Sequence, residues 1–401
     1  MTSPQAARAR ISTLDGWRGV AILLVLAEHA GQYGQFKNLM WAKQGSLGVD
    51  IFFVLSGYII TTRLIGERAK YSIINLRGFY LRRVFRILPL VAVYLSALCL
   101  VSRFVNLIDF HWQELAGSLF FFRNYQLAAH PGGIYTAHFW SLSIEEHFYL
   151  LWPALLLWFG NRRALWLALT GAITCGLWRL YDCTHPSGMV GRMFPAATPG
   201  LRFLRTDVRF DGLLLGCALA LVLTRPSVRD FIFRNFPKET PLLAGVVLFQ
   251  NLQWTNGFPS LTTYVLVTVM LASTLVVEEG LAHQWLNSRL LIWIGTISYS
   301  VYVWQQLFLL HPVGNILPLG RLSLFPVNIA CVFGVASCSF YFLERPAIAF
   351  GKRRYARKVN DIPPPADGAP MALTPDRLNN LAISPQTATR HGGSDLPLSR
   401  A

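Results

Sequence analysis

Two ionisable side chains, Arg18 and His29, share one face of an apolar segment near the beginning of the sequence. Their separation is eleven residues, which in a helix is three turns plus about 20°, or about 16 Å along the axis. Asp15 lies on the same stripe, whereas Glu28 points about 100° away from His29. A histidine inside a membrane span is usually functional and has the chemistry of a general base. The alternative is a histidine that only packs against a neighbouring helix.

A pair of carboxylates, Glu145 and Glu146, stands in the stretch HFWSLSIEEHFYLLWP at 138–153. A buried carboxylate beside an imidazole holds its orientation and stabilises the imidazolium that forms on proton uptake. We expect Glu145 to enter the same membrane layer as His29 and to orient it. Adjacent residues cannot share a helix face, so at most one of the two glutamates serves such a site. Alternatively, both belong to an interfacial belt and face water.

Two arginines, Arg83 and Arg86, are three residues apart in FYLRRVFRILP at 79–89 and project from one helix face. Guanidinium groups offer planar, bidentate donors that suit phosphate oxygens, so the pair is a candidate anion site together with Arg18. The spacing alone is equally typical of basic clusters that anchor a helix at lipid headgroups.

Other polar residues lie where the same apolar segments begin or bend. GSLGVDIFFVLSGYII at 45–60 and VRFDGLLLG at 208–216 each contain an aspartate. We treat these residues as supporting the site: Asp15, Asp50, Ser56, Trp140, Ser143, Glu146, Arg209 and Asp211. Ser141, Ser143 and Asn124 are candidate donors to an oxyanion. The six cysteines are scattered without a C-x-x-C pair, so we expect neither a disulfide framework nor a metal site.

The composition indicates the elements that must position these residues. Of the 401 residues, 53% are hydrophobic and 14% are charged, against about 25% charged residues in ordinary soluble domains. The apolar residues form blocks of roughly 17–25, long enough to cross a hydrocarbon core. The sequence therefore predicts an all-α integral membrane protein. Its net charge of +16 lies mostly in short connections, which marks topology and not a nucleic-acid partner.

The apolar blocks predict about ten transmembrane helices. We place them near 17–33, 45–65, 84–105, 139–160, 164–181, 211–224, 241–254, 260–277, 290–312 and 324–344. The block 113–128 is either an extra span or a re-entrant segment within or against the membrane. Ten spans keep the basic loops together on one side, with both termini cytoplasmic, whereas an eleventh would place the later basic loops outside.

Three regions follow from this division: a cytoplasmic amino-terminal segment at 1–10, a transmembrane domain at 11–350, and a basic, then Pro- and Ser-rich, disordered cytoplasmic tail at 351–401. The external loop 182–210 holds four arginines, which include Arg209. Such a long loop is either a folded lid that binds the acceptor or only a surface cover.

Taken in order, several stretches resemble the membrane-bound acyltransferase 3 family over about residues 11–348. They are LDGWRGVAILLVLAEH, GVDIFFVLSGYII, FYLRRVFRILP, FWSLSIEEHFYLLWP, RFDGLLLG, IGTISYSVYVW and FLERP. The resemblance implies a bacterial inner-membrane enzyme that transfers an acyl group, most commonly acetyl, from coenzyme A to a hydroxyl of a saccharide, glycolipid or natural product. It also implies that His29 is the essential histidine with Arg18 as its partner, that Arg83 and Arg86 form the R-x-x-R pair, and that Glu145 is the first motif glutamate.

Two departures qualify this resemblance. Many members carry a histidine in the late span where this sequence has Gln305, and some carry a soluble carboxyl-terminal domain where this chain has a polar tail. We therefore expect a standalone acyltransferase without a second catalytic histidine there. The same buried residues would also suit a proton-coupled transporter, a lipid flippase or a non-catalytic sensor. The sequence carries no signal for the oligomeric state.

Overall fold

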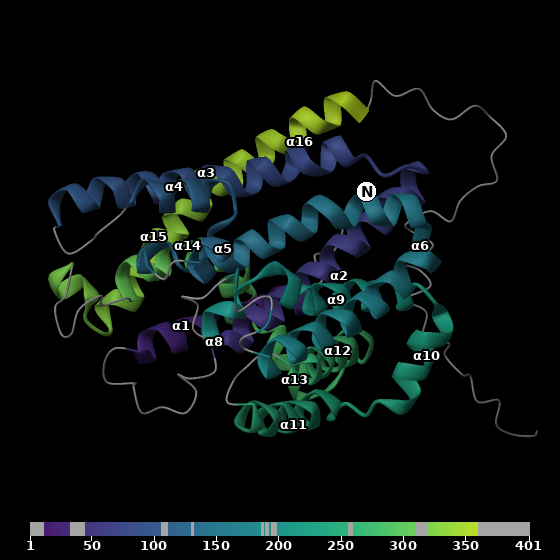
Figure 1. The fold of residues 1–401 in the computed structure, drawn as a ribbon. Helices are drawn as coiled ribbons and strands as arrows, with labels where there is room; N and C mark the ends of the chain where they lie inside the picture. Colours follow the sequence, from purple (N-terminus) through teal and green to yellow (C-terminus); the bar gives the residue numbers. More distant parts are fainter. Residues whose placement is uncertain are drawn as a thin grey trace, which may run out of the picture.

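The computed structural model describes residues 12–32, 45–105, 111–129, 132–185, 188, 192–193, 199–255, 260–309 and 319–359. The described residues form helices and contain no strand (Figure 1). The longer helices are α1 (Ser12–Gln32), α2 (Ser46–Tyr71), α3 (Leu76–Phe104), α6 (Phe139–Thr184), α9 (Phe210–Val222), α11 (Thr240–Trp254), α12 (Leu261–Val276), α14 (Arg289–Leu309), α15 (Val327–Ser339) and α16 (Arg345–Val359). Shorter ones are α4 (Trp112–Leu119), α5 (Arg123–Ala129), α8 (Pro199–Arg202), α10 (Pro226–Asn235) and α13 (Gly280–Leu286), with single turns at Ile134–Thr136, Thr206–Val208, Gly320–Ser323 and Phe340–Glu344.

Within the described residues, each of the ten predicted spans coincides with one or more helices or with part of one; the ends of the spans 17–33 and 290–312 lie outside the described residues. The predicted spans 139–160 and 164–181 are two limbs of α6, which bends where Gly160 adopts a positive φ of 69° that favours glycine. By length and hydropathy, four helices among the described residues qualify as membrane spans, and up to six if two bent helix pairs are counted. The described chain is thus a helical protein with several candidate spans, and the number ten stays a prediction.

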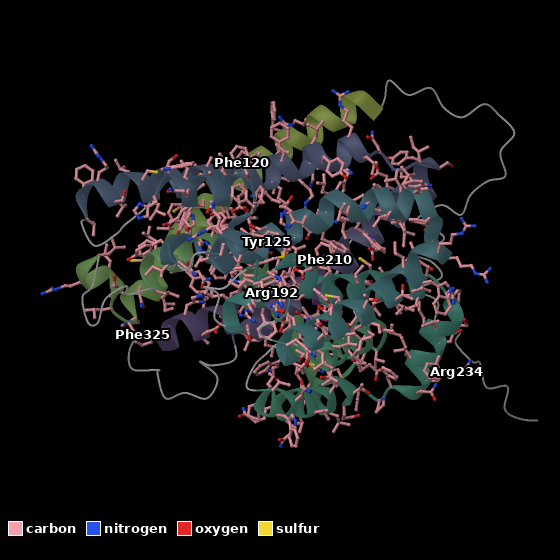
Figure 2. All side chains as sticks on the ribbon, in the orientation of Figure 1. Phe120, Tyr125, Arg192, Phe210, Arg234 and Phe325 are labelled. Carbon is pink, nitrogen blue, oxygen red and sulfur yellow. The ribbon has the colours of Figure 1, made fainter. Side chains whose placement is uncertain are left out.

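The connections between helices gather at two ends of the bundle. Figure 1 shows α10 and the bend of α6 at one end, and α4 with the beginning of α15 at the other. α10 lies in the basic connection before α11, and its Arg234 points away from the bundle (Figure 2). Which of these two ends faces the cytoplasm stays a prediction.

The segment 113–128 forms two short helices that do not continue into each other. α4 has 8 residues and α5 has 7, whereas a helical span needs about 20. They are separated at Phe121, which has a φ of 58°. Arg123 is 3% exposed and donates to the carbonyl of Gly132 at 2.6 Å and to Thr136 at 3.1 Å. The segment is therefore folded against the beginning of α6, which favours the interpretation without an extra span.

Two pairs of helices cross with their backbones almost touching. A Cβ atom added at Gly57 of α2 would lie 1.9 Å from the carbonyl oxygen of Leu213 in α9, and one at Gly295 of α14 would lie 1.8 Å from that of Asp15 in α1. Small residues permit such close approach between membrane helices. α1 and α14 run parallel, because Asp15 lies beside Gly295 and His29 contacts Gln306 further along both helices.

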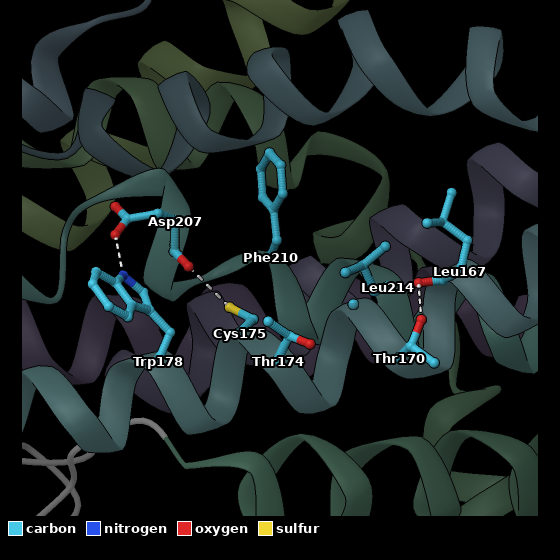
Figure 3. A pocket seen from close by; sticks show the side chains of 9 residues that line it. Leu167, Thr170, Thr174, Cys175, Trp178, Asp207, Phe210 and Leu214 are labelled. Carbon is cyan, nitrogen blue, oxygen red and sulfur yellow. Dashed lines mark hydrogen bonds between the residues drawn. The ribbon is translucent and has the colours of Figure 1, made fainter.

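An apolar groove follows the outside of α6 and α9. The larger part has a volume of about 480 Å³, and a smaller part of about 170 Å³ continues it between the two limbs of α6. Figure 3 shows Cys175 and Trp178 of the second limb of α6 facing Asp207. Phe210 and Leu214 of α9 lie further along the groove. The groove is lined by none of the proposed catalytic residues, so it does not form the candidate active site.

We expect the Gly57→Ala variant to be less stable than the parent protein. The added Cβ would meet backbone atoms, which cannot rotate away, and such overpacking costs about 1–3 kcal/mol. Thermal unfolding in one detergent would show a lower midpoint for Gly57→Ala. The matched control is Gly66→Ala on the same helix, where no atom lies within 4 Å of the new Cβ. Equal midpoints for the two variants would contradict the close crossing.

Candidate active site

His29 lies near the end of α1 and contacts α14. Its Nδ1 is 2.9 Å from the carbonyl oxygen of Val25, one turn earlier, and its Nε2 is 3.4 Å from the amide nitrogen of Gln306. A neutral imidazole whose Nδ1 donates to a carbonyl keeps the lone pair on Nε2. The geometry therefore makes Nε2 the basic atom of His29.

His138 joins the same cluster from the beginning of α6. Its Nδ1 is 2.8 Å from the side-chain oxygen of Gln306, and its Nε2 is 3.1 Å from the carbonyl oxygen of Val303. Tyr302 donates to the carbonyl of His138 at 2.8 Å and lies 2.6 Å from the hydroxyl of Ser141. We refer to His29, Gln306 and His138 as the histidine layer. Gln306 and His138 are not among the residues predicted from the sequence, although a polar residue late in an apolar helix and a histidine just before WSLSIEE were both visible signals.

Glu145 does not take the position expected beside His29. It accepts hydrogen bonds from Ser56 at 3.0 Å and from Tyr149 at 3.1 Å, while Gln306 contacts the imidazole. The physical reason is the helix rise, because Glu145 follows His138 by seven residues, or about 10 Å along the axis. Glu28 also diverges from His29, as expected, since its side chain lies against Gly45 at the beginning of α2.

Arg83, the first arginine of the R-x-x-R pair, is held inside the bundle by side chains of α6. Arg83 forms an ion pair with Glu146 at 3.1 Å, and its guanidinium lies 3.2 Å from the ring centre of Tyr149. Its side chain is 18% exposed and that of Glu146 is 22% exposed. The second motif glutamate, and not the first, is therefore the direct partner of this arginine.

The positive charges of Arg86 and Arg18 both act on Glu344, a carboxylate that is not among the residues predicted from the sequence. Glu344, in the turn before α16, is 3% exposed, accepts a hydrogen bond from Ser300, and interacts with the charges of both arginines. Arg18 also pairs with Asp15 at 3.6 Å. We call Arg18, Arg83 and Arg86, with Glu146 and Glu344, the arginine layer. It lies about 16 Å from the histidine layer along α1, as estimated from the rise per residue between positions 18 and 29.

The predicted aspartates Asp50 and Asp211 form buried ion pairs. Asp50 pairs with Arg209 at 2.9 Å and accepts from Tyr264 at 2.9 Å. Asp211 accepts from both terminal nitrogens of Arg179, at 3.1 and 2.6 Å. These pairs connect α2, α6, α9 and α12, so their geometry indicates a structural role in the packing of the bundle.

Two of the four arginines of the predicted external loop, Arg205 and Arg209, are buried, whereas Arg192 is exposed. Arg205 is 2% exposed and pairs with Asp182 at 3.0 Å and Asp207 at 2.8 Å. Burial raises the pKa of Asp207, but the hydrogen bonds and charge of Arg205 outweigh burial and hold it below its ordinary value. The guanidinium of Arg209 lies 5.1 Å from the ring centre of Trp140. Arg205 and Arg209 therefore fasten the loop to the bundle instead of presenting charge to an acceptor.

The remaining predicted hydroxyl and amide donors are already engaged. Ser143 donates to the carbonyl of Phe139 in its own helix at 2.9 Å. Asn124 donates to Thr206 at 3.0 Å, and the hydroxyl of Ser141 contacts Tyr302. Gln305 is fully buried, and neither polar atom of its side chain has a hydrogen-bond partner among the described residues. None of these side chains is aimed at His29 by a contact in the described part of the chain.

Comparison with known proteins adds an independent observation to this geometry. A family model described as an acyltransferase domain matches residues 11–344. The chain belongs to the acyltransferase 3 family. The histidine and arginine layers of this acyltransferase 3 protein both lie inside the matched range, as do the buried ion pairs.

Three curated relatives of this acyltransferase 3 protein are bacterial. The chain is 29% identical over 384 residues to the peptidoglycan O-acetyltransferase OatA of Listeria monocytogenes, covering 88% of this chain and 58% of that protein. It is 29% identical over 380 residues to the putative peptidoglycan O-acetyltransferase YrhL of Bacillus subtilis, covering 87% and 56%. The O-acetyltransferase OatA of Staphylococcus aureus is 27% identical over 378 residues, covering 86% and 58%. The chain thus spans less than two thirds of these relatives, and no solved structure matches it.

We expect removal of one member of a buried ion pair to destabilise this acyltransferase 3 protein strongly. The variant Asp211→Ala leaves the charge of Arg179 buried without its partner, which typically costs about 3–5 kcal/mol. Thermal unfolding of Asp211→Ala should show a much lower midpoint, and the double variant with Arg179→Met should recover part of the loss. Asp230→Ala, on an exposed residue of α10, is the control. A double variant no better than the single one would contradict the pairing.

Proposed function

We propose that this chain is an integral membrane O-acyltransferase of the bacterial inner membrane that transfers an acyl group of the acetyl type from coenzyme A to a hydroxyl of a cell-envelope saccharide. The single observation that carries the proposal is the basic Nε2 of His29 in a family of acyltransferases. The relatives named as peptidoglycan O-acetyltransferases support a peptidoglycan-type hydroxyl as the acceptor.

The arginine layer is the proposed site for the phosphates of the donor. Guanidinium groups bind phosphate through charge-assisted, bidentate hydrogen bonds. Arg83 and Arg86 already interact with the carboxylates of Glu146 and Glu344. Donor binding would therefore exchange the carboxylate contact of Arg83 for phosphate contacts. In this proposal, α10 and the bend of α6 lie on the cytoplasmic side. The pantetheine arm would then extend past Arg18 toward the histidine layer.

His29 is the proposed general base. The acceptor hydroxyl gives its proton to Nε2 as its oxygen bonds to the carbonyl carbon of the thioester. The carbon–sulfur bond of the donor then breaks, and the proton passes from His29 to the leaving thiolate. An ester and free coenzyme A are released, so protons and electrons balance without a metal or redox partner.

We expect His29→Ala to lower acetyl transfer by about 10²- to 10⁴-fold, the usual contribution of general-base help. The assay is release of free thiol from acetyl-coenzyme A by purified protein in the presence of cell-envelope glycan. His185→Ala, at an exposed histidine that follows α6, should keep the rate of the parent. Transfer near the parent rate by correctly folded His29→Ala would contradict the role of His29.

We expect Arg83→Ala combined with Arg86→Ala to weaken donor binding. Hydrogen bonds to charged groups contribute about 1.5–3 kcal/mol each, so the KM for acetyl-coenzyme A should rise about tenfold or more. The control is Arg82→Ala, which removes an adjacent arginine that pairs with Glu67 on another helix. Titration of binding with acetyl-coenzyme A would measure the effect directly. An unchanged donor affinity in the double variant would remove this assignment.

A further inference from the structure

We propose that Gln306 and His138 are positioning residues for His29, with the amide of Gln306 matching both protonation states of its imidazole. This inference rests on the proposed role of His29 as a base. Gln306 is 3% exposed and His138 is 2% exposed, and they approach His29 from two other helices, α14 and the beginning of α6. The three side chains form one continuous series of polar contacts.

The orientation of the Gln306 amide follows from a backbone group that can only donate. The backbone N–H of His138 lies 3.4 Å from the side-chain oxygen of Gln306, and Nδ1 of the same residue lies 2.8 Å from that oxygen. The amide oxygen therefore faces His138, and the NH₂ group faces Nε2 of His29 at 3.4 Å. Because Nδ1 of His29 donates to Val25, its Nε2 is an acceptor, and the Gln306 amide donates to it.

The ring contacts of His138 also suit a second orientation of the Gln306 amide, in which the long 3.4 Å contact from the backbone N–H of His138 is given up. Its ring nitrogens face two oxygens, those of Gln306 and Val303, whereas a neutral imidazole has one N–H. If the Gln306 amide turns over, its NH₂ group donates to Nδ1 of His138, and Nε2 of His138 donates to Val303. The amide oxygen then faces His29 and accepts from Nε2 once this atom carries a proton.

The surroundings hold His138 in place while the amide turns. The ring of His138 lies 4.6 Å from that of Phe139 and 5.5 Å from that of Tyr94, measured between centres. Tyr302 donates to the carbonyl of His138 at 2.8 Å. The moving part is therefore one neutral carboxamide between two fixed imidazoles. A carboxylate at position 306 would instead accept from Nε2 of His29 and keep a proton on it.

The first test uses the unaltered protein. In the protein labelled with ¹⁵N-histidine, the signals of His29 are identified by their loss in His29→Ala. At neutral pH we expect a protonated Nδ1 and an unprotonated Nε2. A protonated Nε2 with an unprotonated Nδ1 would overturn the proposal, whatever the variants do.

The second test compares Gln306→Met with Gln306→Glu. We expect Gln306→Met to lower kcat about tenfold, with the KM for acetyl-coenzyme A within twofold of the parent, because a positioning bond of about 1.4 kcal/mol is lost. Gln306→Glu should also lower kcat, and its ¹⁵N spectrum should show a protonated Nε2 on His29. The matched control is Gln305→Met, one position away on the same helix, which should keep kcat within twofold.

The outcomes separate this proposal from the function itself. Full activity of Gln306→Met, or an unprotonated Nε2 of His29 in Gln306→Glu, overturns the positioning role while His29 remains the base. Full activity of His29→Ala overturns the proposed mechanism. A drop in kcat that is equal for Gln305→Met and Gln306→Met indicates general damage to α14 and also counts against the proposal.

Discussion

A charge buried in an apolar helix bundle persists only where it meets a partner, and this constraint organises the interior of the protein. The pairs of Asp50 with Arg209 and of Arg83 with Glu146 each join segments that are distant in sequence. In the latter pair, Arg83 also lies against the ring of Tyr149. Pairing thus decides which helices are neighbours. Among the described residues, it leaves His29 as an interior imidazole whose hydrogen-bond contacts are to neutral groups.

The backbone crossings set the register in which these polar groups meet. Because Gly295 lets α14 approach α1 closely, the two parallel helices keep a fixed alignment over several turns. That alignment brings Gln306 to His29. A similar crossing at Gly57 fixes α2 against α9, and α2 carries Ser56, which holds Glu145. Glycines without any chemistry of their own therefore determine which donor reaches which acceptor.

The sequence predicted the helical elements well because long apolar blocks and the spacing of Arg18 and His29 are local properties. It also anticipated that Glu28 and His29 diverge, since this follows from 100° per residue. It misplaced Glu145, because the depth of a residue in one helix relative to another depends on where neighbouring helices cross. It placed Arg209 in an external loop but did not predict its burial, because a basic residue near the end of a span is expected at the surface unless its buried partner, here Asp50, is known.

The fixed distance along α1 between Arg18 and His29 has a consequence for the choice of donor. A helix is stiff, so this separation acts as a molecular ruler whose length is set by residue count. A donor whose phosphates are held near Arg18 presents its reactive carbon near His29 only if the flexible arm between them has the matching length. Under the proposed mechanism, selectivity for the donor would then depend on the length of the arm between phosphate and thioester. Activated acyl groups without such an arm would not be substrates.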